Sequence, residues 1–98
     1  MKIGFIGCGN MGTAMVKGIL DSGKCKGSEI MISAKTAQSL EKKKTELGVL
    51  TSQDNRAVAE FAELLFLAVK PQFYEEVLKE IKDSVRAGQL IISIAPGK

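Results

Sequence analysis

The sequence contains no histidine and no tryptophan, and only two cysteines and two prolines occur in its 98 residues. Without histidine the chain has no imidazole to act as a general acid or base, and two isolated thiols cannot build a Cys/His zinc site. The sequence therefore predicts no catalytic residue and no metal ligand. The low cysteine content favours a reducing, cytoplasmic location.

Long apolar segments are also missing. The longest run, residues 64–69, is far shorter than the roughly 20 residues that cross a bilayer, and glycines interrupt the first apolar stretch well before a signal-peptide core is complete. The net charge is only +3, and the basic cluster at residues 42–44 has no aromatic residues nearby to stack on bases. We expect neither a membrane nor a nucleic acid as partner.

Short apolar runs alternate with amphipathic stretches along the whole chain, which is typical of β-strands and α-helices in turn. Hydrophobic residues make up 45% and charged residues 26%, as in a globular protein. The length fits one domain over residues 1–98. Strands are expected at residues 3–6, 29–33, 49–51, 64–69 and 90–95.

Helices are expected between these strands. Met11, Ala14, Met15, Gly18 and Ile19 predict the buried face of the first helix, which Gly23 ends. The other expected helices are one from about Thr36 to Leu47, closed by Gly48; a short one capped by Asn55; and one from Pro71 to about Gly88, with Tyr74, Val77, Leu78, Ile81 and Val85 on its apolar face and Arg86 near its end.

Right-handed crossovers between parallel strands leave few possible arrangements. The sequence predicts an α/β fold of Rossmann type: a doubly wound parallel sheet with strand order 3-2-1-4-5 in a three-layer α/β/α sandwich. Ligands of such sheets bind outside the carboxyl ends of strands one and four. The loops at residues 7–12 and 68–71 are therefore the candidate site.

The first of these loops has the pattern G-x-G-x-x-G between a strand and a helix, formed by Gly7, Cys8, Gly9, Asn10, Met11 and Gly12. In this context the first glycine allows a tight turn, the second a close approach of the backbone to a pyrophosphate, and the third close packing of the helix. The pattern predicts dinucleotide binding at the helix N-terminus. The alternative is a glycine-rich turn without a ligand.

The end of the second strand indicates which dinucleotide is bound. An NAD site has an Asp or Glu there, whereas this chain has Ser33, Ala34, Lys35 and Thr36. Lys35 and the hydroxyls of Ser33 and Thr36 are suited to a 2′-phosphate, which favours NADP(H). The alternative is a surface lysine followed by a threonine N-cap.

Three further residues have two interpretations each. Lys70 closes the fourth strand, where it faces either the ligand or solvent. Cys8 lies near a helix N-terminus, where a thiol can become reactive, but without a neighbouring base it is better read as a small residue filling the loop. Cys25 belongs to no motif, and the aromatic residues are expected in the core or on helix faces.

Several segments together resemble the N-terminal domain of pyrroline-5-carboxylate reductase. They are residues 3–12, Lys17-Gly18, Asp54-Asn55, residues 67–72 and residues 92–95. The glycine loop is shared with many dehydrogenases, whereas the Ala-Val-Lys-Pro segment followed by the Ser-Ile-Ala strand is more particular. The resemblance covers all 98 residues. Three positions depart from the family: Cys8 replaces a more usual alanine, Lys35 an arginine, and Pro96 a small residue.

The resemblance implies NADPH-dependent reduction of Δ1-pyrroline-5-carboxylate to L-proline, in proline biosynthesis. It places the pyrophosphate at residues 7–12, the 2′-phosphate at residues 33–35, the adenosine ribose at Asn55, and the nicotinamide at Ala68, Val69, Lys70 and Pro71 with Ala95. In the family a following helical domain binds the small-molecule substrate and forms the homo-oligomer. Because this chain lacks that domain, we expect it to bind NADP(H) without turnover.

Two other functions fit the same residues. One is an NADP oxidoreductase similar to β-hydroxyacid dehydrogenases, which share the glycine loop and the Met-Gly that follows. The other is a non-catalytic NADP-binding module, which the short length favours.

Overall fold

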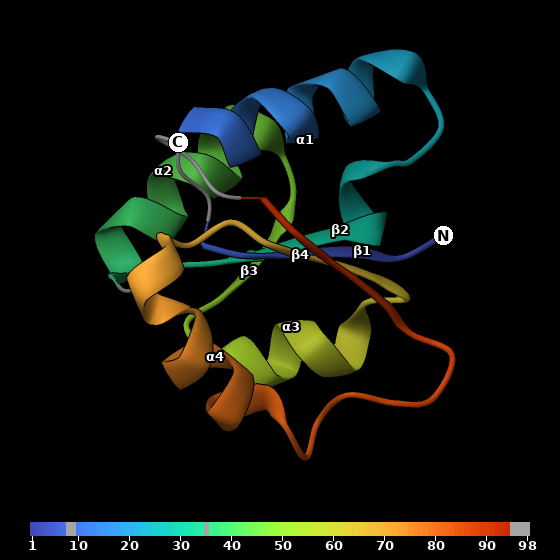
Figure 1. The fold of residues 1–98 in the computed structure, drawn as a ribbon. Coiled ribbons are helices and arrows are strands. Elements are labelled where there is room, and N and C mark those ends of the chain that lie inside the picture. Colours follow the sequence, from blue (N-terminus) through green and yellow to red (C-terminus); the bar gives the residue numbers. More distant parts are fainter. Residues whose placement is uncertain (8–9, 35, 95–98) are drawn as a thin grey trace.

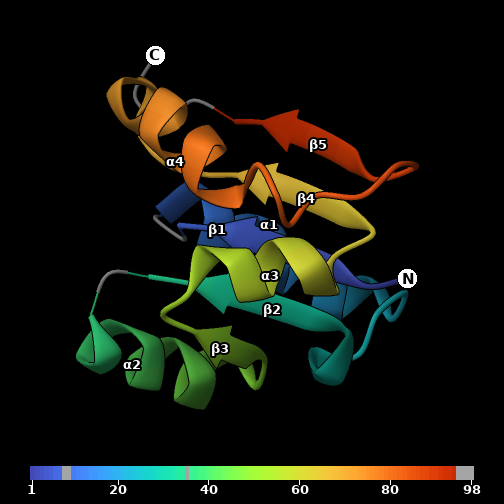
Figure 2. The same ribbon diagram turned by 90° about the horizontal axis from the view of Figure 1, so that it is seen from below.

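Five parallel strands form one sheet in the computed structural model, which describes residues 1–7, 10–34 and 36–94. The strand order is β3-β2-β1-β4-β5, as the sequence predicts. Figure 2 shows β3 and β5 at opposite edges of the sheet. The strands are β1 (Ile3–Ile6), β2 (Ile30–Ser33), β3 (Leu50–Ser52), β4 (Leu64–Leu67) and β5 (Leu90–Ser93).

Helices cover both faces of the sheet, which gives the predicted three layers (Figure 1). Helices α1 (Asn10–Ser22) and α2 (Ala37–Leu47) lie on one face, and α3 (Asn55–Phe61) and α4 (Tyr74–Ile81) on the other. Two short 3-10 helices, η1 (Gly27–Glu29) and η2 (Pro71–Phe73), precede β2 and α4. The predicted ends of α2 are confirmed, because Thr36 Oγ1 accepts the Ser39 N–H and Gly48 is left-handed at φ 69°.

Successive side chains of the central strands point to opposite faces of the sheet, which divides the core into two parts. Ile3 and Phe5 of β1 point toward α1 and α2, where the Phe5 ring stacks on the Phe66 ring with their centroids 4.8 Å apart. Ile6 instead packs with Leu65 and with residues of α3 and α4. Strands buried on both faces explain why β1 and β4 read as continuous apolar runs.

The buried face of α1 differs from the predicted one. Val16 is fully buried, and Met15, Ile19 and Leu20 pack against the same core, whereas Ala14 and Gly18 are exposed. Apolar residues surround much of this helix, so several stripes satisfy the 3.6-residue period. Contact with the sheet selects the stripe that contains Val16.

The segment after α4 also differs from the prediction. The helix ends at Ile81 instead of continuing toward Gly88, and Leu78 is exposed. Arg86 therefore lies beyond the helix, and its guanidinium donates to the Ala62 carbonyl, 3.2 Å away. Gln89 donates to the carbonyls of Ala59 and Ala62. These contacts satisfy carbonyls near the end of α3 and draw the chain out of a helical path.

The predicted strand boundaries shift by one or two residues. Glu29 belongs to η1, and β3 begins at Leu50. β4 ends at Leu67, and β5 ends at Ser93, so the predicted strand residue Ala95 lies outside the described residues.

The N-cap of α3 is Asp54, and the prediction of Asn55 in that role is wrong. Asp54 Oδ1 accepts the Arg56 backbone N–H at 2.9 Å and the Arg56 Nε–H at 3.3 Å. These two hydrogen bonds, the backbone one first, lower the pKa of Asp54 below its usual value. Asn55 is the first residue of the helix, and its side chain is free to face the sheet.

Gly4 allows α3 to approach the sheet closely. A Cβ atom at this position would lie 2.7 Å from Val58 Cγ1 and 2.8 Å from Ala62 Cβ. Because both contacts are closer than carbon atoms tolerate, the helix packs directly on the backbone of β1. The missing side chain at residue 4 therefore sets the depth of α3.

Substitution Gly4→Ala should overpack this contact and destabilise the chain by about 1–3 kcal/mol. Chemical unfolding followed by circular dichroism measures the loss. Gly18→Ala is the matched control: Gly18 lies within α1 with no atom near its missing Cβ, so helix propensity should raise stability by about 0.5–1 kcal/mol. Equal stability of Gly4→Ala and wild type would contradict this packing.

The cap at Asp54 should add a pH dependence to stability. Because the pKa of Asp54 is lowered in the folded chain, its contribution to stability is complete above the pKa of the unfolded chain and disappears as the pH falls from there through the lower pKa of the folded chain. Asp54→Asn keeps an oxygen acceptor that does not titrate. Urea unfolding over this range should therefore show a shallower loss of stability in Asp54→Asn than in wild type, and parallel curves would refute the role.

Candidate functional site

A cleft of about 330 Å³ lies at the carboxyl edge of the sheet. Its walls come from the ends of β1 and β2, the segment after β4, the start of α3 and one side of α4. This is the edge that the strand order predicts for a ligand. The lining residues that matter below are Gly7, Ser33, Asn55, Val69, Glu76 and Glu80.

Gly7 makes the tight turn that the sequence predicts at the end of β1. Its φ of 76° is left-handed, and a Cβ there would lie 2.7 Å from Val69 Cγ1. Its N–H donates to Ser33 Oγ over 3.2 Å and so points into the fold. Amide groups for a pyrophosphate must then come from later in the loop.

The rest of the predicted loop opens α1. Asn10 and Met11 are the first residues of this helix, and Gly12 is buried in its first turn. Close packing of the helix at Gly12 is what the third glycine of the motif predicts. The first turn of α1 carries no acidic residue, so no side-chain carboxylate there opposes an anion. Cys8 and Gly9 lie outside the described residues.

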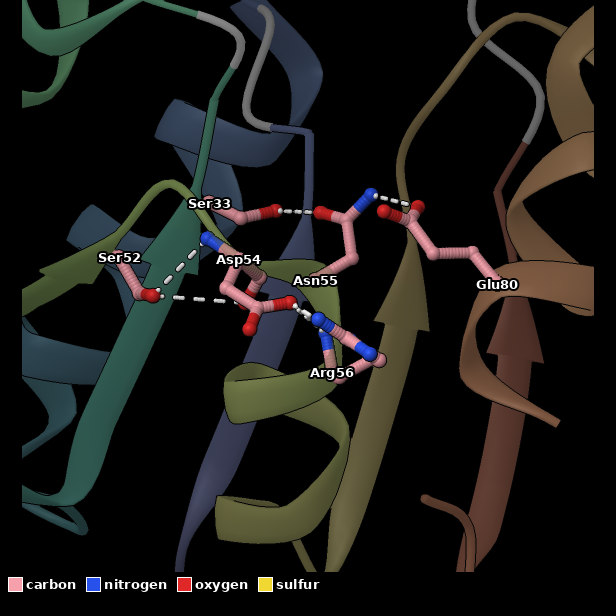
Figure 3. A network of polar contacts seen from close by, with 6 residues as sticks. All are labelled: Ser33, Ser52, Asp54, Asn55, Arg56 and Glu80. Carbon is pink, nitrogen blue, oxygen red and sulfur yellow. Dashed lines mark hydrogen bonds and ion pairs between the residues drawn. The ribbon is translucent and has the colours of Figure 1, made fainter. Parts of the chain in front are cut away.

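Three side chains from different elements are linked at the base of the cleft. Ser33, only 1% exposed, accepts the Gly7 N–H and donates its hydroxyl to Asn55 Oδ1 at 2.6 Å. Asn55 Nδ2 in turn donates to Glu80 Oε1 at 2.7 Å. Figure 3 shows the Asn55 side chain between Ser33 and Glu80. The structure thus brings the predicted residues Gly7, Ser33 and Asn55 together.

The described residues at the end of β2 include no carboxylate. Ser33, Ala34 and Thr36 are uncharged, and the Thr36 hydroxyl caps α2, as in the alternative reading of this corner. Lys35 lies outside the described residues. Glu29 is at the opposite end of β2, where the Lys26 N–H and then the Met1 ammonium, 3.2 Å away, lower the pKa of its carboxyl group.

The segment after β4 forms another wall. The Ala68 N–H donates to the Ile6 carbonyl over 2.9 Å, and Val69 lines the cleft. Lys70 is exposed and precedes Pro71, the first residue of η2. Its exposure at the edge of the site fits both of its interpretations, since a lysine there is exposed whether it faces a ligand or solvent. The last predicted contact, Ala95, lies outside the described residues.

Sequence analysis missed the carboxylates of the cleft. Glu76 and Glu80 of α4 both line it, although no carboxylate follows β2. The residues Phe73, Glu76, Val77 and Glu80 line the same wall at spacings of three and four, which places them on one side of the chain through η2 and α4. That spacing was the signal in the sequence that could have identified the two carboxylates.

Cys25, the cysteine that the structure describes, does not line the cleft. Cys25 is buried, and its Sγ donates to the Met1 carbonyl at 3.6 Å. In the part of the chain that the structure describes, no three His, Cys, Asp or Glu side chains gather as a metal site would require. None of the helices described is long and apolar enough to span a bilayer.

Comparison with known proteins gives a consistent family. A family model described as "NADP oxidoreductase coenzyme F420-dependent" matches residues 2–97. Pyrroline-5-carboxylate reductase 3 of Danio rerio is 44% identical over 97 residues, which are 99% of this chain and 33% of that protein. Pyrroline-5-carboxylate reductase of Escherichia coli K12 is 36% identical over 96 residues, covering 98% of this chain and 36% of the relative.

Solved structures agree with this assignment. A pyrroline-5-carboxylate reductase from Coxiella burnetii superposes with a TM-score of 0.88 at 37% identity, over 98% of this chain and 36% of that one. The Plasmodium falciparum enzyme, solved with NADP bound, gives 0.81 at 26% identity, over 97% of this chain and 33% of that one.

These matches confirm the resemblance inferred from the glycine loop and the Ala-Val-Lys-Pro segment, and they confirm the Rossmann-type fold. The chain spans about a third of the length of the curated relatives that it matches. It belongs to the family described as NADP oxidoreductase, coenzyme F420-dependent.

Proposed function

We propose that this chain is the NADP(H)-binding part of a pyrroline-5-carboxylate reductase, which reduces Δ1-pyrroline-5-carboxylate to L-proline. The observation that carries the proposal is the Gly7 turn, fixed by Ser33 and Asn55 beside a strand end without a carboxylate. Relatives bearing this name match nearly the whole chain, which supports the substrate class.

The described residues fit a dinucleotide phosphate. Helix α1 has 13 residues, and its N-terminus offers backbone N–H groups and a positive dipole without an opposing acidic side chain. Residues 7–12 would hold the pyrophosphate. Lys35 would contact the 2′-phosphate, Asn55 the ribose, and residues 68–71 with Ala95 would border the nicotinamide. The Ser33 and Thr36 hydroxyls, predicted as phosphate contacts, are instead bonded within the chain, Ser33 to Gly7 and Asn55 and Thr36 to the Ser39 N–H, so they would support this corner without contacting the phosphate.

When bound, the cofactor supplies the hydride. The chain itself binds and orients it and shields one side of the reaction from water, for which no side-chain acid or base is needed. In the complete protein, the substrate site and a homo-oligomer interface would lie in the remaining two thirds of the length. We further infer a cytoplasmic location from the low cysteine content.

Selectivity for NADPH tests the proposed phosphate corner. We expect calorimetry to show tighter binding of NADPH than of NADH, and Lys35→Ala to reduce the ratio of the two affinities about tenfold by removing one charge-assisted contact. Lys44→Ala, which removes an exposed lysine of α2, is the matched control and should leave the ratio unchanged. A ratio unaltered by Lys35→Ala would count against the phosphate role, and wild type that binds neither nucleotide would overturn the proposed function.

An activity assay tests whether the chain binds the cofactor without catalysing the reduction. The 98-residue chain should bind NADPH but should not oxidise it when Δ1-pyrroline-5-carboxylate is added, because it supplies the cofactor site alone. NADPH absorbance, followed in parallel with a full-length reductase as positive control, measures this. Steady NADPH consumption by the chain alone would show that it contains a complete active site.

A further inference from the structure

The side-chain amide of Asn55 is held from two sides by groups of opposite hydrogen-bonding character. The Ser33 hydroxyl already accepts the Gly7 N–H, so its own hydrogen is directed to Asn55 Oδ1. The Glu80 carboxylate can only accept, so it takes a hydrogen from Asn55 Nδ2. A reversed amide would place its oxygen against the carboxylate, and Glu80 therefore fixes the amide orientation.

Packing of α4 determines where Glu80 lies. Its neighbour Ile81 is 1% exposed, and Val77, one turn earlier, belongs to the same core cluster as Val58 of α3. The backbone of α4 is thus fixed relative to α3, and the Glu80 carboxylate reaches across to the first residue of that helix (Figure 3). Within the described part of the chain, Glu80 is the one hydrogen-bond partner of Asn55 Nδ2.

The charge of Glu80 is unfavourable for the proposed ligand. A carboxylate in the wall of a cleft that takes a polyanion lowers the affinity by like-charge repulsion. Its hydrogen bond to Asn55 offsets this repulsion by ordering a ligand contact. An oxygen acceptor on the amide nitrogen also polarises the amide, which strengthens Asn55 Oδ1 as the acceptor for Ser33. The effect extends through Ser33 to the turn at Gly7.

We propose that Glu80 is a positioning residue of the cofactor site, which acts through Asn55 by fixing its amide and, with Ser33, the Gly7 turn. This inference rests on the proposed function. It predicts that the oxygen acceptor of Glu80 supports binding, whereas its negative charge does not contribute to it. Alanine and glutamine at position 80 separate these two properties, because glutamine keeps the acceptor without the charge.

Calorimetry with NADPH tests the role. Glu80→Ala should weaken binding about tenfold, whereas Glu80→Gln should bind as tightly as wild type or more tightly, because the repulsive charge is gone. Glu75→Ala removes another exposed carboxylate of the same helix, one that pairs with Lys79 and does not line the cleft, and it should leave binding unchanged. Glu80→Gln as weak as Glu80→Ala, or Glu80→Ala equal to wild type, would overturn the proposal.

A double-mutant cycle shows whether Glu80 acts through Asn55. In an Asn55→Ala background, Glu80→Ala should cause no further loss of NADPH affinity, since the group that it positions is absent. An additive loss in the double variant would instead assign Glu80 an independent effect and overturn the proposed route. Thermal unfolding of each variant verifies that the affinities refer to folded protein.

Hydrogen exchange in the wild-type chain tests the proposal even if the Glu80→Ala variant does not fold. In NMR spectra, the Asn55 side-chain amide should exchange with solvent at least about tenfold more slowly than that of Gln38, which is exposed on α2, because its hydrogen is bonded. Equal exchange rates would overturn the fixed amide. Absence of NADPH binding by wild type would overturn the proposed function and this role together, whereas binding that Glu80→Ala leaves unchanged would overturn the role of Glu80 alone.

Discussion

The hydrogen bond between the Ser33 hydroxyl and Asn55 Oδ1 joins the elements that form the cleft. Ser33 ends β2, Asn55 begins α3, and the same hydroxyl receives the N–H of Gly7 at the end of β1. Because the Ser33 side chain is almost completely buried, losing it would leave two polar groups without partners, at a cost of roughly 1–3 kcal/mol each. The position of the glycine turn and the orientation of Asn55 are therefore set by one buried hydroxyl.

This constraint gives the cleft two chemically different sides. The α1 side presents a helix N-terminus whose first turn contains no acidic residue, which is the environment that an anion prefers. The α4 side contributes Glu76 and Glu80, and one of these carboxylates is occupied by the Asn55 amide. An anionic ligand is thus directed toward α1, and the α4 side is better suited to an uncharged, hydrogen-bonding part of the same molecule.

The sheet could be predicted from the sequence because its strands are apolar runs separated by glycines, and crossover handedness limits their order. Features that depend on contacts between residues far apart in the sequence could not be predicted in this way. Asp54 and Asn55 are equally good N-cap residues, and the buried partner Ser33 decides that Asn55 turns inward. Similarly, α4 ends at Ile81 because Arg86 and Gln89 bind the carbonyl of Ala62, which follows α3, and local helical spacing cannot reveal this contact. The loop glycines were identified correctly as a motif, but the motif says nothing of the carboxylates across the cleft.

Gly4 and Gly7 connect the packing of the core to the geometry of the site. Gly4 lets Val58 rest against the backbone of β1, and Val58 lies one helical turn after Asn55. A side chain at residue 4 would push that turn away from the sheet, and Asn55 would move with it, away from Ser33. Gly7 performs the corresponding function at the end of the strand, where Val69 occupies the space that a Cβ would need. The two glycines, one within β1 and one just after it, thus hold α3 and the segment after β4 close enough for the Ser33–Asn55 hydrogen bond to form. A change in the packing of the core would therefore also change the geometry of the site.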